Sequence, residues 1–183
     1  MANKYAICMA DGCEEIEGLT VVDLLRRAGI SVEMVSINAD KRVTGSHGIA
    51  FEADTTAAGA DWSAYDGVIL PGGMPGTTNL KANEYVRKAV KEYDAAGKLV
   101  AAICAAPTVL ADCGVLNGRA ATCYPGLEGQ LTGAKTSQDS VVIDGHVITS
   151  RGVGTAIAFA LAITAYVKDR KSADDLAKAI VYA

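Results

Sequence analysis

Histidine is scarce in this sequence: it has only His47 and His146, and neither has a cysteine or a second histidine at the short spacing typical of zinc sites. We therefore expect no metal site and no cofactor. The five cysteines are an odd number and include no Cys-x-x-Cys pair. A framework of disulfide bonds is therefore not expected.

Long runs of one charge and long apolar runs are also missing. Seventeen lysines and arginines stand against 21 aspartates and glutamates, and no basic run is longer than two residues. This pattern indicates no nucleic-acid or membrane surface, so a small molecule is the expected partner. The longest apolar segment, Thr155–Val167, is shorter than the roughly 20 residues that span a bilayer. The N-terminus turns acidic before a signal peptide could form, so we expect a cytoplasmic protein.

What is present is a regular alternation of short apolar strands and amphipathic helices in 183 residues, which predicts a single domain over 1–183. Strands are predicted at Tyr5–Met9, Ser31–Ile37, Gly67–Leu70 and Leu99–Ile103. Helices are predicted at Glu15–Ala28, at Asn83–Ala96, from Cys104 to about Cys113, and at Gly154–Lys168 and Ala173–Tyr182. Hairpins are predicted within Lys41–Glu52 and around the turn Asp144-Gly145.

This alternation favours a parallel sheet, because a parallel strand needs a crossover helix to return to the same edge. The predicted fold class is α/β, a flavodoxin-like sandwich whose mostly parallel sheet has helices on both faces and an added antiparallel hairpin. Ligands of such sheets bind at the carboxyl ends of the strands. Three features follow strand ends here: the segment Asp11–Glu17, the tripeptide Pro71-Gly72-Gly73, and Cys104.

Cys104 ends an apolar strand and precedes Ala-Ala-Pro, a pattern typical of a sharp strand-to-helix turn. Pro107 fits the first turn of a helix. A thiol at a helix N-terminus is expected to have a lowered pKa, to be nucleophilic and to oxidise readily. The alternative is that Cys104 fills apolar space, as we expect of the other four cysteines.

Gly72 and Gly73 allow the backbone to approach a ligand closely and to turn an N–H group toward it. This N–H group and that of Ala105 could together stabilise an oxyanion. An ordinary Pro-Gly turn is the alternative. The first helix begins with Glu14, Glu15 and Glu17. Negative charge at a helix N-terminus stabilises the helix, so these residues need no function to explain them. The one that points toward the thiol would have a raised pKa and could transfer a proton.

Five motifs together resemble the ThiJ/PfpI superfamily, in the branch of the Parkinson-disease-associated deglycase and its bacterial relatives. They are GCEEIE at 12–17, VDLLRRAGI at 22–30, VILPGG at 68–73, AAICAAP at 101–107 and TSRGVGT at 149–155. The resemblance implies that Cys104 is the reactive cysteine, that Glu17 is hydrogen-bonded to it, and that Gly73 and Ala105 are the backbone donors. It also implies a homodimer with the first helix at the interface.

Tyr124 departs from the family pattern, because the human-type members have histidine at this position before the proline. A phenol can donate a hydrogen bond to an oxyanion but is a poor base at neutral pH. This departure argues against peptidase or class I glutaminase chemistry and assigns the general-base role to Glu17. His47 lies in a loop that in the family approaches the partner subunit's cysteine, so it is a possible neighbour of the site. His146 is expected at the surface.

These observations support three hypotheses. The first is a cysteine-dependent glyoxalase or deglycase that acts on small α-oxoaldehydes such as methylglyoxal, or on their early adducts with amines and thiols. The second is an oxidative-stress sensor or redox-regulated chaperone in which Cys104 is oxidised to a sulfinate. The third is a scaffold in which the cysteine turn is vestigial.

Overall fold

A seven-stranded sheet forms the centre of the computed structural model, which describes residues 3–182. All neighbouring strands are parallel except the edge pair β10 and β11, which is the predicted antiparallel hairpin. In spatial order the strands are β10 (Val141–Asp144), β11 (Val147–Ser150), β7 (Leu99–Ile103), β6 (Gly67–Leu70), β1 (Lys4–Met9), β2 (Ser31–Ser36) and β5 (Thr55–Thr56). The predicted fold class is therefore confirmed.

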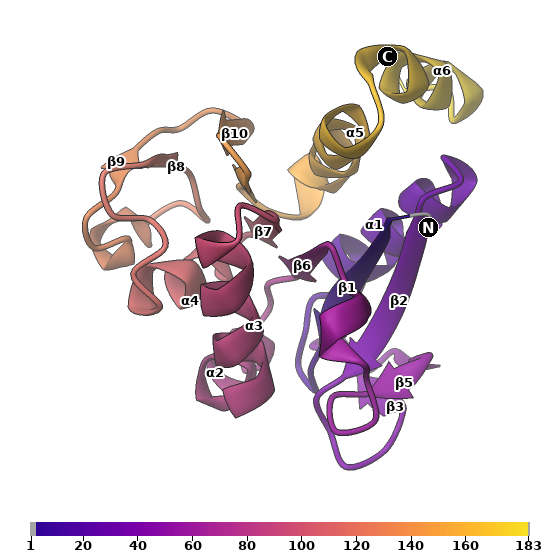
Figure 1. The fold of residues 1–183 in the computed structure, drawn as a ribbon, viewed down its shortest axis with the longest axis vertical. Coiled ribbons are helices and arrows are strands. Elements are labelled where there is room, and N and C mark those ends of the chain that lie inside the picture. Colours follow the sequence, from indigo (N-terminus) through magenta and orange to yellow (C-terminus); the bar gives the residue numbers. More distant parts are fainter. Residues whose placement is uncertain (1–2, 183) are drawn as a thin grey trace.

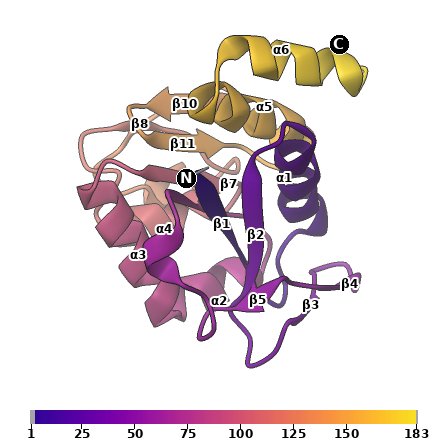
Figure 2. The same cartoon turned by 45° about the vertical axis from the view of Figure 1, so that its right-hand side comes forward.

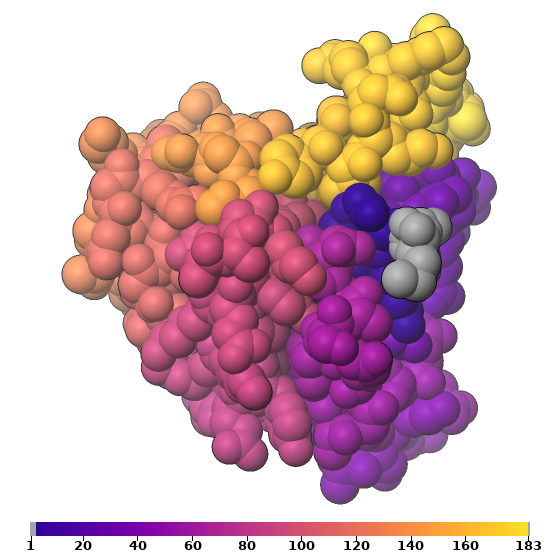
Figure 3. Space-filling model, viewed as in Figure 1, coloured from indigo at the N-terminus to yellow at the C-terminus, as the bar shows by residue number. Residues whose placement is uncertain are grey.

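Helices cover both faces of the sheet (Figures 1 and 2). One layer contains α1 (Glu15–Arg27), α5 (Ala156–Val167) and α6 (Arg170–Ala179), which pack in that order. The other contains α2 (Gly76–Ala82), α3 (Glu84–Ala95) and α4 (Pro107–Asp112). Figure 3 shows the C-terminal helices, in yellow, projecting from the rest of the surface. No helix among residues 3–182 is long and apolar enough to cross a membrane.

The alternation of side chains along the strands produces two cores, one on each face of the sheet. Leu70 and Ala102 face the core beneath α3 and α4, whereas Ile69 and Ile103 face the core beneath α1 and α5. Both cores are apolar up to the ends of the strands. The predicted catalytic residues and oxyanion donors lie in the loops and the first helical turn that follow the carboxyl ends of the strands.

Small strand pairs and 3₁₀ turns complete the chain. The predicted hairpin within Lys41–Glu52 is confirmed as β3 (Arg42–Thr44) and β4 (Ala50–Glu52), which are antiparallel. Elements without a sequence prediction are α2, β5, the parallel pair β8 (Ala120–Ala121) and β9 (Lys135–Thr136), and the 3₁₀ turns at Trp62–Ala64 and Glu128–Gln130. A third 3₁₀ turn, Val153–Thr155, takes the first residues of the helix predicted at Gly154–Lys168.

Helix ends account for most differences from the sequence predictions. The Asn83 side chain accepts a hydrogen bond from the Val86 N–H at 3.1 Å, which confirms the predicted start of α3. The last helix begins at Arg170 rather than Ala173, because Asp169 caps it by accepting from the Ser172 N–H at 2.6 Å. The helix predicted from Cys104 to about Cys113 is shorter, since α4 covers only Pro107–Asp112.

Candidate active site

Cys104 is the first residue after β7, and its backbone lies in the left-handed region with φ of 66°. This conformation is strained for a residue with a side chain and is typical of a nucleophile elbow. Hydrogen bonds hold it on both sides: the Cys104 N–H donates to the Ser150 carbonyl at 3.0 Å, and its carbonyl accepts from the Tyr124 N–H at 2.8 Å. The surrounding chain therefore imposes the turn that projects the thiol from the sheet.

Glu17 lies on the first turn of α1 and is completely buried. Its Oε2 atom accepts a hydrogen bond from the Gly72 N–H at 2.9 Å. Its Oε1 atom is buried and has no hydrogen-bond partner among residues 3–182. The carboxyl group interacts with the thiol of Cys104. Glu17 is thus the acidic residue of the first helix that points toward the thiol.

The glycine loop after β6 packs tightly against both of these residues. A Cβ atom at Gly72 would lie 2.6 Å from the Cβ of Cys104 and 2.7 Å from Oε2 of Glu17, so only glycine fits. Gly73 has φ of 87°, and its N–H and that of Ala105 both interact with the Cys104 sulfur. These two N–H groups are the predicted oxyanion donors, and the structure places both beside the thiol.

The electrostatics of the pair differ from the sequence prediction. Burial raises the pKa of Glu17 to about 7. Burial, with the nearby Glu17 charge, raises the pKa of the Cys104 thiol to about 12, so the predicted lowering was wrong. The helix dipole is too weak to reverse this, because α4 has only six residues and begins three residues after Cys104. Near neutral pH the site therefore contains a thiol beside a carboxyl group that can accept its proton.

Tyr124 is half exposed, and its ring lies at the rim of the site. A Cβ atom at Gly152 would be 3.5 Å from the Tyr124 ring and 3.9 Å from Oε1 of Glu17, so Gly152 lies between them. Sequence reasoning did not select Gly152, although it is part of the TSRGVGT motif. The absence of a side chain at Gly152 keeps space open above the unpaired carboxyl oxygen.

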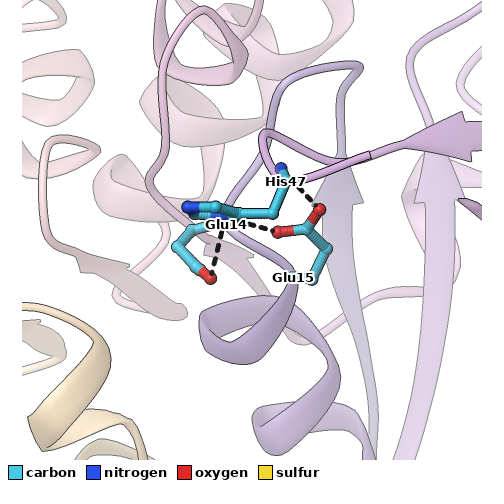
Figure 4. Close-up of side chains that lie close together, drawn as sticks. All are labelled: Glu14, Glu15 and His47. Atoms are coloured by element: carbon cyan, nitrogen blue, oxygen red, sulfur yellow. Dashed lines mark hydrogen bonds and ion pairs between the residues drawn. The ribbon is translucent and has the colours of Figure 1, made fainter. Parts of the chain in front are cut away.

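His47 lies in the turn between β3 and β4, and its side chain is 71% exposed. Its ring contacts Ser46 and, at the start of α1, Glu14 and Glu15, rather than Cys104 (Figure 4). His146 is not a surface residue as predicted, because its side chain is only 18% exposed. Its Nε2 atom lies 2.8 Å from a carboxylate oxygen of Asp94. Within the described chain, each histidine is thus engaged with acidic residues away from the thiol.

A cavity of about 720 Å³ lies along α3 and includes none of the residues of the thiol site. Aromatic rings of Trp62, Tyr85 and Tyr93 line it. The Trp62 indole N–H already donates to the Ala57 carbonyl, and the Tyr93 hydroxyl donates to the Trp62 carbonyl. Because these groups are already paired, the thiol site is the stronger candidate for chemistry.

The comparisons with known proteins agree with this fold. The DJ-1/PfpI family model matches residues 3–166. Drosophila melanogaster DJ-1beta is 37% identical, and the alignment covers 100% of this chain and 99% of that protein. Its crystal structure has a TM-score of 0.95 and 100% coverage of both chains.

Two further relatives bear on the chemistry of the cysteine. A structure of Toxoplasma gondii DJ-1, described as oxidized, is 33% identical with a TM-score of 0.95 and covers 100% of both chains. A Bacillus subtilis protein provisionally named a cysteine protease is 33% identical over 82% of this chain and 90% of its own length. The family thus includes cysteine-nucleophile enzymes. With its flavodoxin-like sheet and near-complete alignment to DJ-1 proteins, the chain belongs to the DJ-1/PfpI family.

Proposed function

We propose that this protein is a cofactor-independent glyoxalase or deglycase that acts on small α-oxoaldehydes, such as methylglyoxal, or on their early adducts with amines and thiols. The observation that supports it is the combination of a strained Cys104 with a buried Glu17 whose Oε1 atom has no partner among residues 3–182. A nucleophile, a base and two oxyanion donors are all that this reaction requires.

In the proposed reaction, the Cys104 sulfur bonds to the aldehyde carbon of methylglyoxal while the thiol proton passes to Glu17. The N–H groups of Gly73 and Ala105 donate to the oxygen that becomes negative. Glu17 returns this proton to the negative oxygen, which gives the hemithioacetal and restores the carboxylate. The carboxylate then moves a proton from the former aldehyde carbon to the neighbouring carbon, which leaves a lactoyl thioester. Water hydrolyses this thioester, releasing lactate and restoring the thiol, so the net reaction is methylglyoxal plus water to lactate.

The direct test is the formation of lactate from methylglyoxal by the purified protein. We expect lactate in proportion to protein concentration and no requirement for added glutathione or metal. Heat-denatured protein controls for nonenzymatic conversion. Lactate at the level of the buffer blank would exclude the glyoxalase function and leave the redox and scaffold hypotheses.

The redox hypothesis is the second candidate, and the oxidized Toxoplasma relative supports it. The raised pKa of the Cys104 thiol weakens it, because the thiolate is the form that oxidises. Intact-mass measurement after mild peroxide treatment tests the redox hypothesis against the scaffold hypothesis. A sensor would gain about two oxygen atoms, roughly 32 Da, on Cys104 alone, whereas oxidation spread over all the cysteines would favour a scaffold.

Peptidase activity is not proposed despite the name of the Bacillus relative. A cysteine peptidase uses a histidine base beside its thiol. The residue at the rim of this site is Tyr124, whereas His47 pairs with Glu15 and His146 pairs with Asp94. Glu17 is the base in the proposal because it is the carboxyl group that interacts with Cys104.

We further propose that the chain acts as a homodimer in the cytoplasm. The resemblance to the family supports the dimer, and the composition supports the location. Size-exclusion chromatography with light scattering is expected to give twice the 18.8 kDa mass of the chain. Fractionation of cells followed by immunodetection tests the location.

Gly72→Ala is expected to lower kcat/KM by about 10- to 100-fold, because displacement of catalytic groups by about 1 Å has an effect of this size. The added methyl group would overlap Cys104 and Glu17 and push the oxyanion loop away from them. The measurement is lactate formation across methylglyoxal concentrations. Gly129→Ala is the matched control, since a Cβ atom there meets nothing within 4 Å. Equal rates for both variants would contradict the proposed role of the loop.

A further inference from the structure

We propose that the space over Gly152, between the ring of Tyr124 and Oε1 of Glu17, receives the methyl group of methylglyoxal, so that Gly152 determines which oxoaldehydes react. This inference rests on the proposed glyoxalase function. It adds the part of the site that recognises the substrate beyond its aldehyde group. The thiol and its two backbone donors act on the aldehyde group alone, which all oxoaldehydes share, so they do not discriminate between substrates.

Neither backbone conformation nor packing requires a glycine at Gly152. Its φ of 167° and ψ of −168° are extended backbone, which any residue adopts. A Cβ atom there would come no closer than 3.5 Å to any atom outside the neighbouring residues, which is an ordinary van der Waals contact. A Cβ atom at Gly72 or Gly73 would instead lie 2.6 or 2.3 Å from its nearest neighbour. Folding thus explains the two glycines of the oxyanion loop but not Gly152.

The space over Gly152 is bounded by an aromatic ring and by one unpaired oxygen. A Cβ atom there would lie 3.5 and 3.9 Å from two ring carbons of Tyr124 and 3.9 Å from Oε1 of Glu17. Glu17 is completely buried, and its Oε1 has no hydrogen-bond partner among residues 3–182. A buried polar atom without a partner is unfavourable, so a bound group is expected to complete its surroundings. That group is expected on the side of Glu17 that faces Gly152.

The proposed reaction places the second carbon of the substrate beside this oxygen. Glu17 moves a proton from the former aldehyde carbon to the second carbon, so one of its oxygens must reach both. Oε2 already accepts from the Gly72 N–H at 2.9 Å, which leaves Oε1 for the transfer. The methyl group on the second carbon is then expected to turn toward Tyr124, because ring carbons form no hydrogen bond with the carbonyl oxygen there.

Backbone hydrogen bonds hold both walls of this space. The Gly152 N–H donates to Oγ1 of Thr155 at 3.0 Å, and the Thr155 N–H donates to the Gly152 carbonyl at 2.8 Å. The Tyr124 N–H donates to the carbonyl of Cys104 at 2.8 Å, which ties this wall to the nucleophile. A site with fixed walls discriminates by size, since the walls do not move to accept a larger group. An added methyl group at Gly152 would therefore compete with that of the substrate.

The test is the preference for methylglyoxal over glyoxal, which has a hydrogen atom in place of the methyl group. We expect Gly152→Ala to lower the ratio of the two kcat/KM values by about 10- to 200-fold, the discrimination that one such carbon supports. Lactate and glycolate are the products to be measured. Gly129→Ala is the matched control and should keep the wild-type ratio, because a Cβ atom there meets nothing within 4 Å.

Two changes at Tyr124 test the opposite wall. Tyr124→Phe keeps the ring and should keep the ratio within about twofold of wild type. Tyr124→Ala should lower the ratio about fourfold, the effect of losing the burial of one methyl-sized group, with the change appearing in KM for methylglyoxal. The Tm of Gly152→Ala should equal or exceed that of wild type, because alanine fits extended backbone and lowers the entropy of the unfolded chain. A changed ratio would then not reflect unfolding.

The possible results separate this inference from the function on which it rests. A lower ratio in Gly152→Ala and Tyr124→Ala, with the wild-type ratio in Tyr124→Phe and the control, would support the inference. An unchanged ratio in Gly152→Ala, or an equal loss with both aldehydes, would overturn it, while lactate formation by wild type would leave the glyoxalase function standing. No product from either aldehyde with wild-type protein would overturn the function and this inference together.

Discussion

Cys104→Ser is expected to reduce lactate formation from methylglyoxal by at least about 1,000-fold in kcat/KM, because loss of a nucleophile removes nearly all covalent catalysis. The structure explains why oxygen cannot replace sulfur here. Glu17 has a pKa of about 7, which makes it a weak base. A serine hydroxyl holds its proton much more tightly than a thiol does, and serine lacks the intrinsic nucleophilicity of sulfur. Steady-state kinetics at neutral pH are the measurement.

Cys113→Ser is the matched control for that variant. Cys113 is a free, partly exposed thiol like Cys104, but it follows α4 on the opposite side from the elbow turn. We expect its kcat/KM to remain within about twofold of wild type, as for a change outside the site. If Cys104→Ser retained activity, or if Cys113→Ser lost it equally, Cys104 could not be the nucleophile.

Glu17→Gln has the second largest expected effect, a loss of about 100- to 10,000-fold in kcat, the range typical of a positioned acid–base group. Glutamine keeps an oxygen that can accept the Gly72 N–H, so the loop is expected to stay in place. What it loses is the ability to take the thiol proton and to carry a proton between the two substrate carbons. The effect should therefore appear in kcat more than in KM.

Two controls separate this chemical effect from a structural one. Glu52→Gln is the same substitution at an exposed position and should leave kcat unchanged. The Tm of Glu17→Gln should equal or exceed that of wild type, because the variant no longer buries an ionisable group whose pKa is raised by burial. Wild-type kcat in Glu17→Gln would show that another group transfers the proton.

The sequence determined much of the fold and the composition of the site. The apolar strands at Gly67–Leu70 and Leu99–Ile103 have the predicted bounds, because apolar runs between turn residues have few alternatives to a buried strand. Parallel strands direct their carboxyl ends to one edge of the sheet, so the sequence alone predicts that Gly73 and Cys104 lie close together. The selection of Glu17 among the acidic residues of its helix came from the family resemblance.

Only the tertiary structure decided the charge states and the contacts between distant segments. The thiol pKa depends on burial and on the neighbouring carboxyl group, which a local pattern at Cys104 does not contain. The contact of His47 with Glu14 and Glu15 joins positions more than 30 residues apart, through the placement of one hairpin against one helix. Secondary structure follows from nearest neighbours along the chain, whereas proton affinity and ligand geometry follow from neighbours in space, and these are set only when the sheet and helices pack.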